Sequence, residues 1–136
     1  MDEFNGDCPM ETRPVHLNFI ESLFPADDAF KVAVLGNSIE CHGWVGRPLV
    51  AVPSPHKRNH FLALSGRHRL AGAKSINWDS VDALVLKLGP HLSVDSTPTG
   101  FVLRDAEGNV LKRENLEAYL RPWAPEAADL VAPEKR

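Results

Sequence analysis

Apolar residues recur along this chain in short runs separated by polar turns, and their spacing alternates between strand-like and helix-like periods. Alternating apolar and polar residues predict a first strand over 15–19. The next segment is mostly apolar and predicts a helix over 28–41, which Asp27 or Asp28 can cap. The remaining predicted elements are strands over 49–52 and 61–64, a helix over 67–77, a strand over 81–88, a hairpin of 101–103 with 110–111, and a helix over 114–120. This order predicts a small α/β domain with a C-terminal hairpin and a short helix.

The two ends of the chain lack such a pattern. Residues 1–13 carry no periodicity and are predicted to be flexible. Residues 124–136 combine prolines with charge, which predicts a flexible tail. A single domain over 14–123 remains, with a core over 15–88 and an extension over 89–123.

Composition narrows the class of protein. The chain has 136 residues, of which 43% are hydrophobic and 24% charged, as is usual for a globular domain. Its net charge of -3 argues against a general nucleic-acid coat, so any contact with a polyanion must be local.

No apolar run is long enough to span a membrane, and the N-terminus is acidic where a signal peptide is basic. Cys8 and Cys41 form no metal pattern, and we expect a cytoplasmic protein without membrane contact.

The most distinctive chemistry lies in a polar turn between the strand over 61–64 and the helix that follows it. This turn consists of Ser65, Gly66, Arg67, His68 and Arg69. Gly66 permits a sharp change of direction, and a helix that begins there points free N–H groups and a positive dipole at one spot. With two arginines and a histidine beside it, the turn is a candidate phosphate or nucleotide site. The alternative is that the arginines are solvated and that His68 is a surface or core histidine.

Several segments, taken in order, resemble the ParB/sulfiredoxin superfamily. Ser38–Gly43 is similar to a helix end in ParB-like domains, and Arg47–Val52 is similar to the strand that follows it. Phe61–Lys74 resembles the strand, the Gly-x-x-Arg box and the alanine-rich helix, and Trp78–Val85 resembles the next strand. The resemblance covers about residues 15–88 and implies a mixed sheet with packed helices.

The resemblance implies a nucleotide at this box. ParB proteins hold CTP there and sulfiredoxins hold ATP, while related free-serine kinases also bind a nucleotide. By this likeness Arg69 would be the main phosphate contact, with His68 beside it and the backbone of Gly66 close to the phosphates. Arg67 stands where sulfiredoxins have a reactive cysteine and ParB has a glutamate linked to CTP hydrolysis, and arginine supplies neither a thiolate nor a base.

Other residues are auxiliary candidates. Glu114 and Asn115 resemble a Glu-Asn pair that ParB uses near the nucleotide and its metal, but an ordinary acidic residue in the first turn of a helix is the favoured interpretation of Glu114. Arg47, Lys57 and Arg58 would extend the cationic surface toward the rest of a nucleotide or a DNA backbone.

Catalysis has only one weak candidate. Any chemistry would be Mg²⁺-dependent phosphoryl transfer or NTP hydrolysis, with Glu40 as base. The histidines form no metal-binding pair, so we expect no structural metal.

Two other functional classes stay open. One is a nuclease-like protein of a plasmid or phage. The other is a catalytically silent interaction module that uses Trp44, Trp78 or Trp123 if these side chains face solvent. A protein partner or a homodimer is possible in either case.

Overall fold

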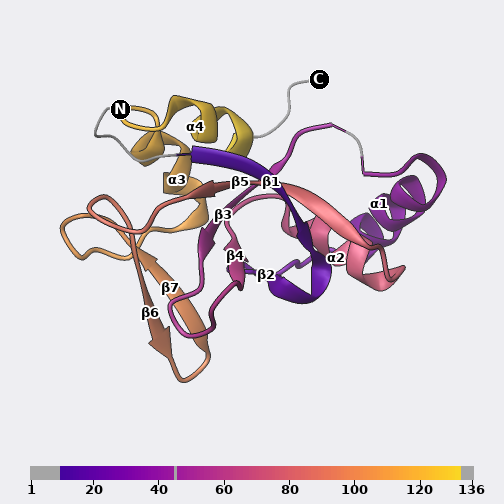
Figure 1. The fold of residues 1–136 in the computed structure, drawn as a ribbon, viewed down its shortest axis with the longest axis horizontal. Coiled ribbons are helices and arrows are strands. Elements are labelled where there is room, and N and C mark those ends of the chain that lie inside the picture. Colours follow the sequence, from indigo (N-terminus) through magenta and orange to yellow (C-terminus); the bar gives the residue numbers. More distant parts are fainter. Residues whose placement is uncertain (1–9, 45, 133–136) are drawn as a thin grey trace.

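The computed structural model describes residues 10–44 and 46–132. Its elements are β1 (Met10–His16), the 3-10 turn η1 (Leu17–Phe19), β2 (Ile20–Ser22), α1 (Ala29–His42), β3 (Leu49–Pro53), β4 (Phe61–Ala63), α2 (Arg67–Ser75), β5 (Ser80–Leu86), β6 (Ser93–Thr97), β7 (Gly100–Arg104), α3 (Arg113–Leu120) and α4 (Pro125–Val131). Figure 1 shows α1 and α2 gathered at one end of the molecule and α3 and α4 at the other.

The central sheet has five strands in the order β1-β5-β3-β4-β2. β3 runs antiparallel to β4, as the polar connection between them predicts, and parallel to β5. β2 runs parallel to β4, while β1 runs antiparallel to β5. The sheet is therefore mixed, which confirms the predicted fold class. β6 and β7 form a separate antiparallel pair.

β3 is buried on both faces, and this divides the core in two. Leu49 and Ala51 pack into a cluster with residues of α1 and α2, whereas Val50 and Val52 pack into a cluster with residues of α3 and α4. Successive side chains of a strand point to opposite faces, so an uninterrupted apolar run here means that both faces are covered. The sheet is the middle layer between two layers of helices.

α1 lies against α2 at a crossing of two glycines. A Cβ added at Gly72 would lie 2.8 Å from the backbone N of Gly36 and 2.9 Å from the carbonyl oxygen of Val32. These atoms belong to the backbone of the facing helix and cannot move without shifting it. The approach of the two helices therefore depends on the missing side chain.

The first strand begins earlier than the sequence predicts. Residues 10–13, predicted to be flexible, belong to β1, and the predicted strand over 15–19 ends at His16 before the turn η1. β1 is an edge strand, and within residues 11–16 only Val15 is buried. An alternation of apolar and polar residues therefore does not reveal this strand. The edge position also tolerates Pro14. Residues 1–9 lie outside the described residues.

The C-terminal hairpin pairs differently from the prediction. β7 pairs with β6, which lies in a stretch expected to be a loop, and the turn between them is at residues 98–99. The predicted partner segment 110–111 makes only an isolated bridge, between Val110 and Arg104. Of the two turns that flank β7, the one with Pro98 and Gly100 closes the hairpin.

The predicted flexible tail over 124–136 is wrong for its described part. Residues 125–131 form α4, which starts with Pro125 and buries Ala127 and Ala128 completely. Proline is well suited to the first turn of a helix, because a backbone N–H at that position has no acceptor within the helix. The remaining residues of the predicted tail, 133–136, lie outside the described residues. None of the described helices has the length and apolarity to cross a membrane.

We predict that Gly72→Ala lowers the free energy of unfolding by about 1–3 kcal/mol, because α1 must shift away from α2 to admit a methyl group. Urea denaturation followed by circular dichroism measures this change. Lys74→Ala, at an exposed position of the same helix, is the control and should stay within about 0.5 kcal/mol. A Gly72→Ala protein as stable as the control would contradict the close crossing.

Candidate functional site

The turn that leads from β4 into α2 is held tightly against the sheet. Gly66 has φ 66° and ψ 34°, in the left-handed region, and a Cβ at this position would overlap the Cδ2 atom of Leu49. The hydroxyl oxygen of Ser65 accepts a hydrogen bond of 2.9 Å from the N–H of Val50 on β3. These two residues fix where α2 begins.

Arg67 and His68 both meet Asp27, which lies just before α1. Nη1 of Arg67 lies 3.2 Å from Oδ1 of Asp27 and donates a 2.7 Å hydrogen bond to the carbonyl oxygen of Pro25. Nε2 of His68 lies 3.1 Å from the same carboxylate oxygen. His68 is buried, whereas the Asp27 side chain is 70% exposed. A carboxylate of the chain itself thus occupies the cationic spot at the start of α2.

The charge of Arg67 acts on this carboxylate. The hydrogen bond from Arg67 is the largest cause that holds the pKa of Asp27 below its ordinary value, and it outweighs the opposing effect of burial; the positive charge of Arg67 and the contact with His68 lower the pKa further. The stability linked to a lowered pKa is present above the ordinary value and is lost as the pH falls through the lowered one. The contact is therefore intact at neutral pH.

Arg69 points to a different part of the molecule. Its Nη1 donates a 2.7 Å hydrogen bond to the carbonyl oxygen of Arg47, and its guanidinium lies 4.0 Å from the ring centroid of Trp44. Arg47 in turn donates to the carbonyl oxygens of Asp129 and Ala132 at the end of α4. Arg47 and Arg69 therefore link α2 to the segment before β3 and to α4, and the structure does not bring Arg69 together with Arg67.

A groove of about 390 Å³ opens beside Asp27 and Arg67. Its apolar walls come from the segment after β2 and from β7, and include Phe24 and Phe101. The start of α3 adds Lys112, Arg113 and Glu114. Cations thus stand on two sides of an apolar hollow. Of the sequence candidates, Arg67 and Glu114 line this groove.

Sequence reasoning missed Phe24, Phe101, Lys112 and Arg113 as site residues. The adjacent cations Lys112 and Arg113 were the available signal, since they directly precede Glu114. Their distance from Arg67 along the chain hides that they share one groove with it.

The other sequence candidates lie elsewhere. Glu40 is exposed on α1, and Lys57 and Arg58 are exposed on the loop between β3 and β4, none of them in the groove. Asn115 follows Glu114 on α3 but does not line the groove. Within the described part of the chain, no three His, Cys, Asp or Glu side chains come together to hold a metal ion.

The tryptophans do not form an exposed face. Trp44, Trp78 and Trp123 are all half-buried. The indole nitrogens of Trp44 and Trp123 are buried, and the ring of Trp123 stacks on that of His91 with centroids 4.2 Å apart. Among the described residues, the exposed large apolar side chains are instead Phe19, Phe30, Val34 and Val110.

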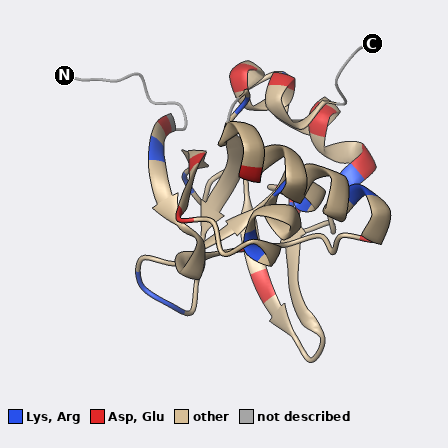
Figure 2. Cartoon of the chain, turned by 90° about the vertical axis from the view of Figure 1, so that its right-hand side faces the viewer, with Lys and Arg blue, Asp and Glu red and all other residues tan. Residues whose placement is uncertain are grey.

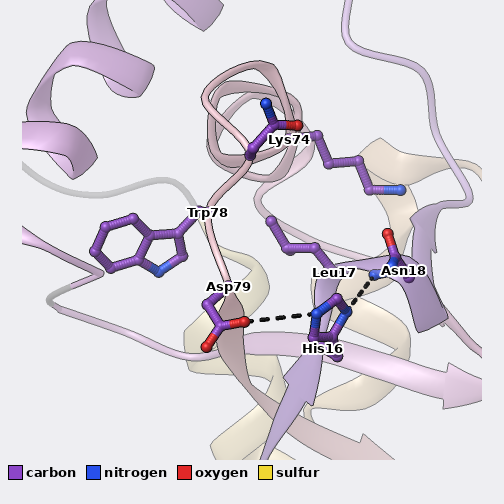
Figure 3. Close-up of a pocket in the computed structure, with 7 residues that line it drawn as sticks. His16, Leu17, Asn18, Lys74, Trp78 and Asp79 are labelled. Atoms are coloured by element: carbon purple, nitrogen blue, oxygen red, sulfur yellow. Dashed lines mark hydrogen bonds and ion pairs between the residues drawn. The ribbon is translucent and has the colours of Figure 1, made fainter.

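A second hollow, of about 470 Å³, lies at the opposite end of α2. Figure 3 shows His16 below Lys74, with Asn18 on one side and Asp79 on the other. Nδ1 of His16 accepts a 3.0 Å hydrogen bond from the N–H of Asn18, and Nε2 lies 3.5 Å from Oδ1 of Asp79. Polar side chains form most of its lining, which combines two amides with an ammonium group, an imidazole and a carboxylate.

Solved structures of other proteins are similar to this one in architecture. ParB, the C-terminally truncated chromosome-partitioning protein from Caulobacter crescentus complexed with CTP-gamma-S, is similar over 58% of this chain and 46% of its own, with 20% identity and a TM-score of 0.51. A conserved hypothetical protein from Pyrococcus furiosus is similar over 63% of this chain and 37% of its own, with 16% identity and a TM-score of 0.50. Sulfiredoxin from Arabidopsis thaliana shares 18% identity over 57% of this chain and 86% of its own, with a TM-score of 0.47.

The likeness to ParB shows the fold: the chain has a ParB-like architecture. It spans less than half of the length of the ParB and Pyrococcus chains. No protein-family description matches the sequence, and no curated protein does.

We predict that the carboxyl group of Asp27 titrates below its ordinary pKa of 3.8, because Arg67 and His68 stabilise its charged form. Carbon-13 NMR of the carboxyl group across the acidic range measures the midpoint. Arg67→Ala should raise this midpoint toward 3.8, whereas Lys31→Ala, on the exposed surface of α1, should leave it unchanged. A normal midpoint in the unmodified protein would contradict the pairing.

Proposed function

We propose that the groove beside Arg67 binds a nucleotide, with its phosphates at Arg67 and the start of α2 and its ring system against the apolar walls. The observation that carries this proposal is the combination, in one groove, of cations from two elements with an apolar wall that includes Phe24 and Phe101. Small-molecule sites typically have this character, a mostly apolar hollow with a few placed polar groups, and volumes of about 300–1,000 Å³.

The start of α2 favours a phosphate. The backbone N–H groups of the first helical turn have no partner within the helix, and the helix dipole adds partial positive charge. Arg67 lies in this turn and contributes a guanidinium with planar, paired donors, which match the oxygens of a phosphate. An anion here would meet backbone and side-chain donors together.

Asp27 stands where the phosphate would bind. Its carboxylate already contacts Arg67 and His68, as an anion of the ligand would. Because the Asp27 side chain is 70% exposed, it can turn out into solvent without loss of packing. Binding of a nucleotide then exchanges an internal anion for the phosphate.

The other cations of the groove would hold the rest of the ligand. Lys112 and Arg113 are exposed at the start of α3, within reach of a second phosphate or of the sugar. Mg²⁺ usually enters such sites with the phosphates and takes one or two protein carboxylates, and Asp27 and Glu114 are the carboxylates that line this groove. Any phosphoryl transfer or hydrolysis would proceed here.

The fold supports the proposal. The ParB structure with the same architecture was determined with CTP-gamma-S, a nucleoside triphosphate analogue. A nucleotide can therefore be held by this fold. Which nucleotide this chain selects is the first point that experiment must answer.

We predict that CTP, ATP or GTP raises the melting temperature of the protein, since a ligand that binds only the folded state stabilises it. Calorimetric titration then measures Kd, with and without Mg²⁺. Arg67→Ala should weaken binding about tenfold or more, because charge-assisted hydrogen bonds to phosphate are lost.

The double variant Lys112→Ala, Arg113→Ala should also weaken binding. It keeps the contact of Arg67 with Pro25, so it separates ligand loss from damage to the fold. Lys31→Ala is the control, at an exposed position outside the groove. Unchanged affinity in both groove variants, or no thermal shift with any nucleotide, would refute the proposed function.

We predict that Asp27→Asn strengthens nucleotide binding about two- to fivefold in the absence of divalent cations, because the internal competitor for Arg67 loses its charge. Asp28→Asn is the matched control. It removes one negative charge from the adjacent residue, and asparagine replaces aspartate well as the cap of α1. Equal affinities of the two variants would mean that Asp27 acts only through net charge and not by occupying the site.

A further inference from the structure

A track of rings and cations crosses the surface formed by η1 and the loop between β3 and β4, and none of its residues lines the proposed nucleotide groove. Phe19, on η1, is 46% exposed. On one side its ring lies 5.8 Å from that of His16, and on the other side 5.2 Å from that of His60, where the contact is edge-on. The three rings come from β1, η1 and the residue before β4, so the fold assembles them.

Cations stand at both ends of this row of rings. Beyond His60, the loop between β3 and β4 carries Lys57 and Arg58, both exposed. Figure 2 shows this loop as a blue stretch without a red segment. Beyond His16 lies the hollow of about 470 Å³, with Lys74 at its edge.

The loop that carries the cations is held in place. The N–H of Ser54 donates to the carbonyl oxygen of His60 at 2.8 Å, and the N–H of His60 donates to that of Lys57 at 3.2 Å. His56 contacts the hydroxyl of Ser96 on β6, and its ring lies 5.7 Å from that of Phe101. No ion pair of Lys57 or Arg58 occurs among the described residues. Their charges are therefore presented to solvent from an ordered loop.

We propose that this track binds single-stranded nucleic acid. Bases stack on exposed aromatic rings with little dependence on sequence, while phosphates pair with cations that follow the strand. Phe19 provides the stacking surface between two histidines, and Lys57 with Arg58 provides the phosphate contacts. The hollow between Lys74 and Asn18 receives an adjacent nucleotide. The proposal concerns a different surface from the nucleotide groove and does not depend on it.

An acidic residue of the hollow opposes this arrangement. Asp79 lines the hollow and its side chain is 90% exposed, but it faces His16. The overall charge of -3 means that binding depends on the local cations and is steeply sensitive to salt.

The test is fluorescence anisotropy with labelled oligothymidylate and oligouridylate of about twelve nucleotides, at about 50 mM salt and above. We expect binding to one or both strands. Phe19→Ala should weaken it about fivefold or more, because a stacking contact is lost. The double variant Lys57→Gln, Arg58→Gln should weaken it similarly and reduce the dependence of log K on log salt by about 1.4.

The chain offers matched controls on α1. Phe30→Ala removes another exposed phenylalanine, 78% exposed, and Lys31→Gln removes another exposed lysine. Neither should alter binding. Arg67→Ala should also leave it unchanged, which separates this surface from the nucleotide groove. Circular dichroism verifies that each variant is folded.

Three outcomes overturn the proposal. The first is no measurable binding of either strand at low salt. The second is binding that Phe19→Ala and the loop double variant weaken no more than the controls on α1 do. The third is complete competition by polyglutamate at equal charge, because the surface would then attract any acidic chain and the rings would contribute nothing.

Discussion

The place where α2 begins depends on a single steric fact, that there is no room for a side chain at Gly66. A Cβ there would overlap Leu49, and the backbone is in the left-handed region that glycine adopts without strain. This close approach sets the first turn of α2 against β3. It directs Arg67 and His68 toward Asp27 on one side and Arg69 toward the segment before β3 on the other. The site and its supports therefore follow from one contact between backbone and sheet.

Much of the fold could be predicted because its central strands carry the strongest patterns. β3 and β4 are uninterrupted apolar runs, and α1 has a capping residue, Asp28, and a terminating Gly43 at the predicted ends. The wrong predictions concern segments in which the local pattern of apolar and polar residues is weak. β1 is a mostly exposed edge strand. α4 buries small alanine side chains, which give only a weak hydrophobic periodicity in the sequence. β6 was hidden because only Val94 in it is buried.

The site was less predictable than the fold. The stretch 65–69 was chosen for its charges, but sequence does not show which partners those charges find. Arg69 and Arg47 are used within the chain to tie segments together, and Asp27 meets Arg67 only because the residues before α1 fold over the start of α2. The groove itself is formed with β7 and α3, whose placement is a matter of tertiary packing. The apolar wall of the groove therefore cannot be predicted from local sequence.

Chemical-shift mapping by NMR tests the central claim most directly, because it reports which residues a nucleotide touches without altering the protein. When CTP or ATP is added to the labelled protein, the account predicts perturbed amide signals at Arg67 and His68, and at Phe24, Phe101 and Arg113 around the groove. The signals of Trp44 and of Asp79, in the hollow at the opposite end of α2, should stay in place. Perturbations confined to Arg69 and Trp44, or spread over the surface without a focus on the groove, would contradict it.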